Sequence, residues 1–375
     1  MEHHDEGKTM VIEVKKTAEA VSKEDDITLT HSSLFPVKPP KNSFFRNPIA
    51  LAGALLLLLI VTVLLLMSDI GNERQNPSET TATPITDAPI SPTSPEGSLH
   101  VVGLSEAVHV TSAVRSDFAL LAEADSLKAI AVKSANEIMY PASLTKIMTF
   151  LVAYDALSDR LDTQLTLTEG IKNQYPEGSR KGIDTGDLLT VEQCMYAMLL
   201  ESDTDAVLML VSETAENETI FAELMNKKAK ELGLTSTHFT NANGLHHKEH
   251  YTTPAEMAAI FAEALKNELF QTIITTHTYV TYLGYYKNGD YATYRMTFFN
   301  STLKNRFEGN NLSLELPNSL TIIGGKTGLT DEAGYCQAAL AVDTAGKEYI
   351  TILGHAPSAK ASAVDTATLY KNYVK

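Results

Sequence analysis

The feature that most constrains this chain is an uncharged apolar run at residues 49–67, IALAGALLLLLIVTVLLLM. An α-helix needs about 20 such residues to cross a bilayer, and this run has 19. A helix buried in a soluble domain is rarely apolar on every face. A cleaved signal peptide would have a shorter apolar core and a small-residue cleavage site soon after it. The run therefore predicts a transmembrane signal anchor.

The charges beside this run predict its orientation. Lys38, Lys41 and Arg46 precede it, whereas Asp69 and Glu73 follow it with a single arginine. Basic flanks stay on the cytoplasmic side of a membrane. We therefore expect a single-pass protein of the cell membrane, with a cytoplasmic N-terminus and an extracytoplasmic main part. Residues 1–48 are charged without periodicity, which predicts a disordered cytoplasmic tail.

Composition divides the remainder of the chain into a linker and a domain. Residues 68–99 are rich in Thr, Pro and Ser, which is typical of an extended extracytoplasmic linker. Residues 100–375 are long enough for one substantial core, which we expect to be the catalytic domain. The net charge of −16 argues against a nucleic-acid partner. Cys194 and Cys336 form no metal or redox pattern and are predicted to be small core residues.

Apolar patterning after residue 100 predicts strands at both ends of the domain. FALLAEA at 118–124 and KAIAVK at 128–133 suggest a hairpin, whereas 143–157, 189–200 and 218–233 have helical periodicity. Asn288-Gly289 is a hairpin signal between tyrosine-rich runs, whose rings we expect to pack across the strands. TIIGGKTG, CQAALAVD and EYITILGHA predict strands before a final helix. The order predicts an α/β (α+β) fold. Both ends of the domain build one antiparallel sheet that helices flank, and a mostly helical subdomain lies between these ends.

A possible nucleophile and base lie at the start of one predicted helix. Ser143 and Lys146 are three residues apart, so their side chains share a helix face. Serine attacks well only when a neighbouring base takes its proton, and a buried lysine can be that base. The alternative is a helix cap and a solvated surface lysine, because Ser-x-x-Lys often occurs by chance.

Two further segments strengthen the catalytic interpretation. Ser202, in LESDTDA, lies where an apolar helical run ends. Lys326, Thr327 and Gly328 lie on a predicted strand whose glycines allow another segment to approach closely. A nucleotide loop is excluded, because the Walker A pattern would need glycine at the position of Leu320.

In this order the three segments resemble the Ser-x-x-Lys, Ser-x-Asn and Lys-Thr-Gly motifs of penicillin-binding proteins and serine β-lactamases. PASLTKIMT, ELGLTSTHFTNANGLHH, YTTPAEMA and GGKTGLTDEAGYC are similar to the serine-type D-alanyl-D-alanine carboxypeptidases, the low-molecular-weight penicillin-binding proteins. The similarity covers nearly all of residues 110–370. It implies a β-lactamase/transpeptidase-like fold, peptidoglycan stem pentapeptides as substrate, β-lactam antibiotics as covalent inhibitors, and no metal or other cofactor.

The resemblance also implies a role for each motif residue. Ser143 would be acylated by the penultimate D-Ala carbonyl, Lys146 would act as the base, and Ser202 would relay a proton to the leaving amine. These are the implied catalytic residues.

The same resemblance implies the substrate-binding residues. Lys326 and Thr327, with Gly328 beside them, would bind the terminal carboxylate. The backbone N–H groups of Ser143 and Leu329 would form the oxyanion hole.

One residue departs from the family pattern. Thr204 stands where the second motif has asparagine, whose amide both donates and accepts hydrogen bonds, whereas a threonine hydroxyl is shorter and has one donor. Because Ser202 is retained, we expect reduced rather than absent activity, with Thr204 still beside the substrate.

The motif residues leave two alternative functions open, and a separate histidine-rich segment suggests a metal site. A serine β-lactamase shares two motifs, but we find no convincing Glu-x-x-Leu-Asn segment for a deacylating glutamate. A non-catalytic wall-binding module could have lost the asparagine, although the intact Ser143 and Lys146 argue against it. HHKEH at 246–250 is not the His-Glu-x-x-His metal pattern and predicts a polar surface loop.

Overall fold

The computed structural model describes residues 99–174 and 178–375. The expected tail at 1–48, the expected membrane span at 49–67 and nearly all of the expected linker at 68–99 lie outside these residues. Within the two described ranges, no helix is long and apolar enough to cross a bilayer.

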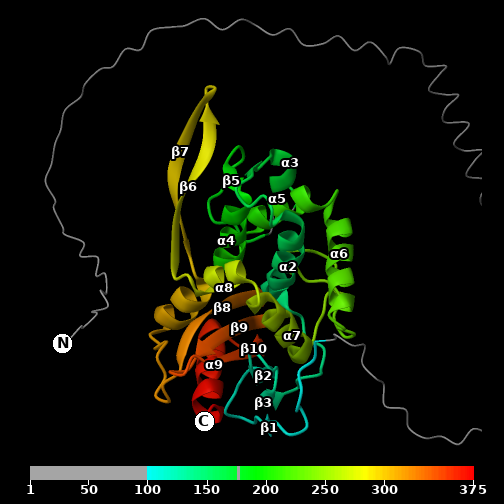
Figure 1. Ribbon diagram of the computed structural model, residues 1–375, viewed down its shortest axis with the longest axis vertical. Coiled ribbons are helices and arrows are strands. Elements are labelled where there is room, and N and C mark those ends of the chain that lie inside the picture. The colour runs from blue at the N-terminus through cyan, green and yellow to red at the C-terminus, as the bar shows by residue number, and fades with distance from the viewer. Residues whose placement is uncertain (1–98, 175–177) are drawn as a thin grey trace, which may run out of the picture. The chain divides into compact units, whose positions relative to one another are not determined.

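A six-stranded sheet forms the base of the fold, and it is built from both ends of the domain (Figure 1). Its order is β1-β3-β2-β10-β9-β8. The N-terminal strands are β1 (Val108–His109), β2 (Phe118–Glu123) and β3 (Ala129–Lys133), and the C-terminal ones are β8 (Thr321–Thr330), β9 (Gly334–Val342) and β10 (Glu348–Ala356). This confirms the predicted arrangement of strands, including the β2–β3 hairpin.

The expectation of a wholly antiparallel sheet is wrong at one edge, where β1 pairs with β3 in parallel. The chain reverses between β1 and β2 and again between β2 and β3, so β1 and β3 run in the same direction. The other neighbouring pairs of this sheet are antiparallel.

Both faces of the sheet are buried, which explains why β2 reads as a continuous apolar run rather than as an alternation. Leu120 and Ala122 pack into the larger core, beneath the helices of the middle of the chain. Ala119 and Leu121 pack into a smaller core with α9 (Ala359–Tyr373), which covers the other face (Figure 1).

The helices that cover the larger core carry most of the middle of the chain. The structure places them at α2 (Thr145–Leu157), α3 (Glu169–Lys172), α4 (Val191–Glu201), α5 (Thr204–Thr214), α6 (Glu218–Glu231), α7 (Pro254–Leu265) and α8 (Glu268–Thr275). The predicted helices at 143–157, 189–200 and 218–233 are thereby confirmed to within a few residues. Side chains begin several of them by accepting a backbone N–H, as Thr190 does at α4 and Asn217 at α6.

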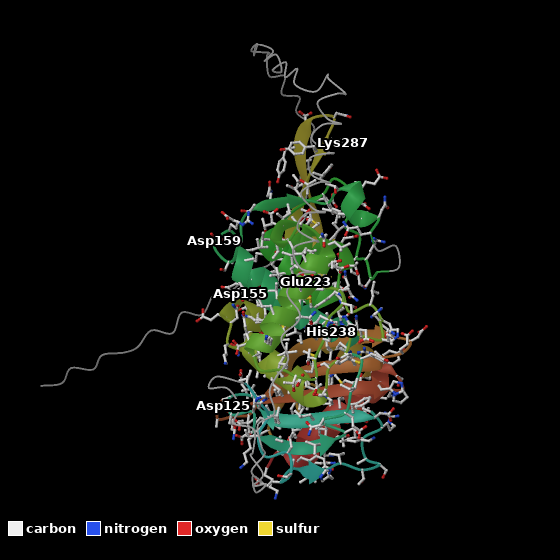
Figure 2. All side chains as sticks on the ribbon, turned by 90° about the vertical axis from the view of Figure 1, so that its right-hand side faces the viewer. Asp125, Asp155, Asp159, Glu223, His238 and Lys287 are labelled. Carbon is white, nitrogen blue, oxygen red and sulfur yellow. The ribbon has the colours of Figure 1, made fainter. Side chains whose placement is uncertain are left out.

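A second sheet lies among these helices, and sequence patterning did not predict it. It contains β4 (Gln164–Thr166), β5 (Leu188–Thr190), β6 (Thr278–Lys287) and β7 (Asp290–Phe299). The predicted β6–β7 hairpin is confirmed, with positive φ at both turn residues Asn288 and Gly289. Cross-strand ring packing is also confirmed, since the Tyr286 and Tyr291 rings lie 5.6 Å apart. The tip of this hairpin, marked by Lys287, extends beyond the helices (Figure 2).

Candidate active site

The structure brings Ser143 and Lys146 into contact. Ser143 lies in the 3₁₀ helix η2 (Ala142–Leu144), and Lys146 lies in the first turn of α2. Lys146 Nζ is 3.2 Å from Ser143 Oγ and donates to the Asn243 carbonyl at 2.7 Å. Only 2% of Lys146 is exposed, so the alternative of a solvated surface lysine is wrong.

The surroundings of Lys146 make it a base near neutral pH. Burial lowers the pKa of the Lys146 ammonium to about 7, and the carboxylates of Asp203 and Glu218 oppose this effect. A lysine with an ordinary pKa would be protonated at neutral pH and could not accept the serine proton. The position of this side chain therefore supplies the neutral amine that nucleophilic attack by Ser143 requires.

A tight turn at residues 241–245 holds the partner of Lys146. Asn241 Oδ1 accepts the backbone N–H groups of Asn243, Gly244 and Leu245 at 2.7–3.1 Å. Gly244 has φ +81°, and a Cβ there would lie 1.9 Å from the Ala142 carbonyl oxygen. The turn is thus pressed directly against the backbone that carries Ser143.

The edge strand β8 forms another wall beside the nucleophile. An added Cβ on Gly328 would lie 3.0 Å from Ser143 N, so a side chain here would push the backbone of the nucleophile aside. Thr327 Oγ1 is 2.9 Å from Ser301 Oγ, and Leu329 is 51% exposed at the end of the strand. The predicted close approach of another segment to these glycines is confirmed.

Lys326 is fully buried on the same strand. Its Nζ donates to the Thr327 carbonyl at 2.8 Å. Burial lowers its pKa, the Lys146 and Arg306 cations lower it further, and Glu201 opposes them. Two further cations so close to a buried lysine favour an anionic ligand, which would relieve their mutual repulsion.

Arg306 is a site residue that sequence reasoning missed. It is 7% exposed, its Nη2 donates to the Gly328 carbonyl at 3.4 Å, and its guanidinium lies 4.9 Å from the Tyr335 ring centroid. Nothing in the local sequence marks it, because the π-helix η3 (Ser301–Phe307) reaches β8 only through the tertiary fold.

Ser202 lies at the junction between α4 and α5, as predicted. It is the C-cap residue of α4, with a left-handed backbone at φ 61°. Asp203 caps α5 by accepting from Ala206 N at 2.9 Å, and it also accepts from Lys181 N at 2.8 Å. The Ser202 hydroxyl is buried, and no group of the described residues hydrogen-bonds to it. It is therefore available to a ligand.

Thr204, two residues after Ser202, is buried, but its side chain faces Gly178. A Cβ on Gly178 would lie 2.5 Å from Thr204 Oγ1. Within the described ranges no hydrogen bond joins the Thr204 hydroxyl to Lys146 or Lys326. The bridging that an asparagine amide could provide is therefore not reproduced by this threonine.

The predicted polar surface loop at residues 246–250 is correct for residues 246–249, which are exposed, and wrong for His250. His250 is 2% exposed, and its Nε2 lies 2.7 Å from Thr145 Oγ1. Its Nδ1 accepts from Thr240 N, so the proton lies on Nε2. Burial and nearby cationic groups lower its pKa to about 3, which keeps this contact with α2 in the neutral form.

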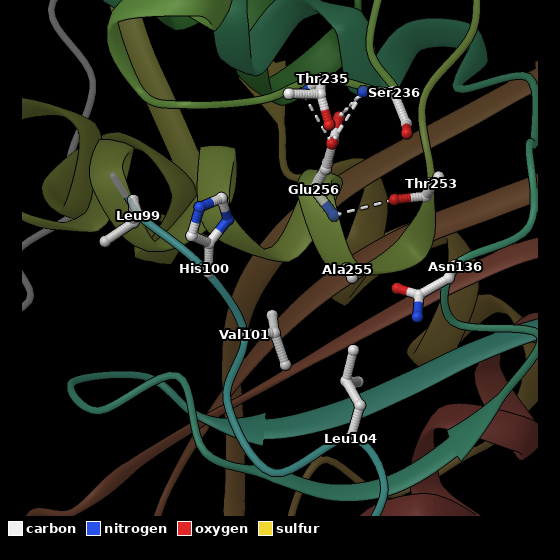
Figure 3. A pocket seen from close by; sticks show the side chains of 10 residues that line it. All are labelled: Leu99, His100, Val101, Leu104, Asn136, Thr235, Ser236, Thr253, Ala255 and Glu256. Atoms are coloured by element: carbon white, nitrogen blue, oxygen red, sulfur yellow. Dashed lines mark hydrogen bonds between the residues drawn. The ribbon is translucent and has the colours of Figure 1, made fainter. Parts of the chain in front are cut away.

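A pocket of about 400 Å³ lies where residues 99–104 meet α7 (Figure 3), and none of the candidate catalytic side chains lines it. Its carboxylate, Glu256, is fully used: it accepts from the backbone of Thr235 and Ser236 and from Thr237 Oγ1. Its role is to hold a loop. Among the described residues, no group of three or more His, Cys, Asp or Glu side chains could hold a metal ion.

Both cysteines are buried and unpaired, which confirms the prediction of core residues. Burial raises the pKa of each thiol, that of Cys336 to about 11.

Comparisons with known proteins point to one family. The family model described as D-alanyl-D-alanine carboxypeptidase matches residues 105–357. DacF, a D-alanyl-D-alanine carboxypeptidase of Bacillus subtilis, is 32% identical over 227 residues, which are 60% of this chain and 53% of the relative. A D-alanyl-D-alanine carboxypeptidase of Streptomyces sp. K15 is 30% identical over 249 residues, 64% of this chain and 80% of the relative. The chain thus spans about half the length of the Bacillus protein.

Solved structures show the same fold. The Streptomyces K15 DD-transpeptidase is similar with a TM-score of 0.61 and 26% identity, over 69% of this chain and 97% of that one. A D-alanyl-D-alanine carboxypeptidase from Mycobacterium tuberculosis has a TM-score of 0.58 at 24% identity, over 70% and 92% of the two chains.

Proposed function

The chain belongs to the D-alanyl-D-alanine carboxypeptidase family, and on that premise we propose that it removes the terminal D-Ala from peptidoglycan stem pentapeptides. The observation that carries the proposal is the 3.2 Å contact between Ser143 Oγ and Lys146 Nζ, at a lysine whose burial brings its pKa to about 7. A serine in contact with a neutral amine is an activated nucleophile.

The reaction proceeds through an acyl-enzyme. Neutral Lys146 accepts the Ser143 hydroxyl proton while Oγ attacks the carbonyl carbon of the penultimate D-Ala. The peptide C–N bond then breaks, and the leaving amine of the terminal D-Ala takes a proton delivered through Ser202. A water molecule, deprotonated in turn by Lys146, hydrolyses the ester and regenerates Ser143.

Binding groups for the substrate lie on β8. Lys326 and Thr327 receive the terminal carboxylate, whose negative charge offsets the repulsion of Lys326 by the Lys146 and Arg306 cations. The N–H groups of Ser143 and Leu329 form the oxyanion hole, and the close contact of Gly328 with Ser143 N supports this arrangement. β-Lactam antibiotics present a carbonyl and a carboxylate to the same groups and acylate Ser143 covalently.

The same proposal includes the location of the enzyme. A signal anchor at residues 49–67 holds the protein in the cell membrane, with residues 1–48 in the cytoplasm. The linker at 68–99 extends the catalytic domain toward its polymeric substrate. The apolar length of the run and the basic residues before it support this location.

Two assays test the activity. A fluorescent penicillin should label the wild-type chain and not Ser143→Ala, and D-Ala should be released from a pentapeptide that ends in D-Ala-D-Ala. Absence of both signals in the wild type would favour a non-catalytic wall-binding module. Rapid hydrolysis of the penicillin, without a persistent adduct, would favour a β-lactamase.

A further inference from the structure

Glu218 acts electrostatically on the catalytic base although it belongs to none of the three motifs. It is the first residue of α6, after the cap residue Asn217, and its carboxylate turns inward toward the turn at 241–245. Its Oε1 accepts from Ala242 N at 3.0 Å and from Asn243 Nδ2 at 3.5 Å. One carboxylate oxygen thus contacts both residues whose carbonyls face α2.

Those two carbonyls hold the base and its helix. The Asn243 carbonyl accepts from Lys146 Nζ at 2.7 Å, and the Ala242 carbonyl accepts from Thr149 Oγ1 at 2.7 Å. The Lys146 ammonium has no carboxylate among its hydrogen-bond partners in the described residues. Glu218 therefore acts on Lys146 in two ways: it holds the backbone of Ala242 and Asn243, and its negative charge favours the protonated amine.

Four ionisable groups from four elements act electrostatically with Lys146. Asp203 at the start of α5 and Glu218 on α6 favour the charged amine. Lys326 on β8 and His250 in the loop after the turn interact with the Lys146 cation unfavourably when they are protonated. Glu218 differs from Asp203 in that Asp203 also caps α5, so replacing it would disturb the Ser202 segment.

We propose that Glu218 is a positioning residue that fixes the turn behind Lys146 and sets the proton affinity of this base. This role rests on the proposed function of Lys146 as the base. A negative charge behind the Asn243 carbonyl stabilises the protonated amine and so holds its pKa up against burial. The same carboxylate keeps the Asn243 carbonyl where Lys146 Nζ can donate to it.

The test separates the charge of Glu218 from its contacts. Glu218→Gln keeps Oε1 as the acceptor for Ala242 N and Asn243 Nδ2, removes the charge and replaces Oε2 with an amide NH₂. In the full-length chain in detergent, lysine labelled with ¹³C at Cε reports the ionisation of each amine, and Lys146→Arg identifies the Lys146 signal. We expect the midpoint for Lys146 to fall by about half a unit to one unit in Glu218→Gln, a three- to tenfold loss of proton affinity.

The matched control is Glu223→Gln, because Glu223 is an exposed carboxylate on the same helix (Figure 2). In Glu223→Gln, the ionisation midpoint of the Lys146 amine should equal that of the wild type. In Glu218→Asp, which keeps the charge, this midpoint should stay close to the wild-type value. Equal midpoints in Glu218→Gln and Glu223→Gln would overturn the proposal. If Glu218→Gln does not fold, Glu218→Ser removes the charge together with the contacts, and the Lys146 midpoint should fall at least as far; a midpoint equal to that of Glu223→Gln would again overturn the proposal.

A second readout connects the shift to the reaction. The acid limb of Ser143 acylation by a fluorescent penicillin should move to lower pH in Glu218→Gln by the same amount as the NMR midpoint. The titration needs no activity, so a wild type that is not acylated would refute the proposed function and still leave the role of Glu218 measured.

Discussion

Gly244→Ala tests whether the turn at 241–245 positions the catalytic base. The added Cβ would meet the Ala142 carbonyl oxygen at 1.9 Å and its carbon at 2.4 Å, whereas ordinary contacts begin near 3.4 Å. Both atoms belong to backbone, so no side-chain rotation can relieve the overlap. The turn must therefore move away from η2 by about 1.5 Å.

This movement should lower the free energy of unfolding and break the hydrogen bond that holds Lys146. Left-handed backbone at a non-glycine residue costs about 1–2 kcal/mol, and overpacking adds about 1–3 kcal/mol, so we expect a loss of roughly 2–5 kcal/mol in the free energy of unfolding. The bond from Lys146 Nζ to the Asn243 carbonyl, now 2.7 Å, would lengthen past 4 Å and break. Acylation of Ser143 should then fall at least tenfold.

Gly289→Ala is the matched control. Gly289 has φ +91° at the tip of the β6–β7 hairpin, and an added Cβ meets nothing within 4 Å. It therefore shares the backbone strain without the overlap. Urea unfolding and the rate of labelling by a fluorescent penicillin should be measured for both variants. Equal losses of stability, or an unchanged labelling rate in Gly244→Ala, would refute the reasoning.

Three other predictions follow from the site. Thr204→Asn should release D-Ala faster than the wild type, because an amide can bridge groups that the Thr204 hydroxyl does not reach; a variant no faster than the parent would contradict this. Acylation of Ser143 should rise with pH through about 7 and level off above it, because only neutral Lys146 accepts the proton, so the rate at pH 5 should be about a hundredfold below the plateau. Cys194 and Cys336 should resist a thiol reagent in the native protein and react in denaturant, since both are buried; fast native labelling would show otherwise.

Much of the fold was predictable because its signals are local. The two-faced burial of β2 produces an uninterrupted apolar run, and Asn288-Gly289 supplies the positive φ values that its hairpin turn needs. The second sheet was not predictable in this way. Its strands β4 and β5 have three residues each; β4 pairs with β5, and β5 pairs with β6 between Leu188 and Gly284, which lie far apart in the sequence.

The identities of the reacting groups could be read from residue type and order alone. The spacing of Ser143 and Lys146 places them on one helix face, and the motif resemblance connected them with Ser202 and Lys326 across almost two hundred positions of the chain. It also marked Thr204 as a departure. These conclusions depend on residue type and order, which do not change on folding.

The reactivity of those groups depends on the folded molecule. A lysine becomes a base near neutral pH through burial and through charges brought from other elements, and burial is a property of the packed molecule. Arg306, His250 and Glu218 reach the site from three separate segments, and no local pattern marks them. The chemistry of Ser143 and Lys146 is encoded in the sequence, whereas the proton affinity that lets them react is set by what the fold places around them.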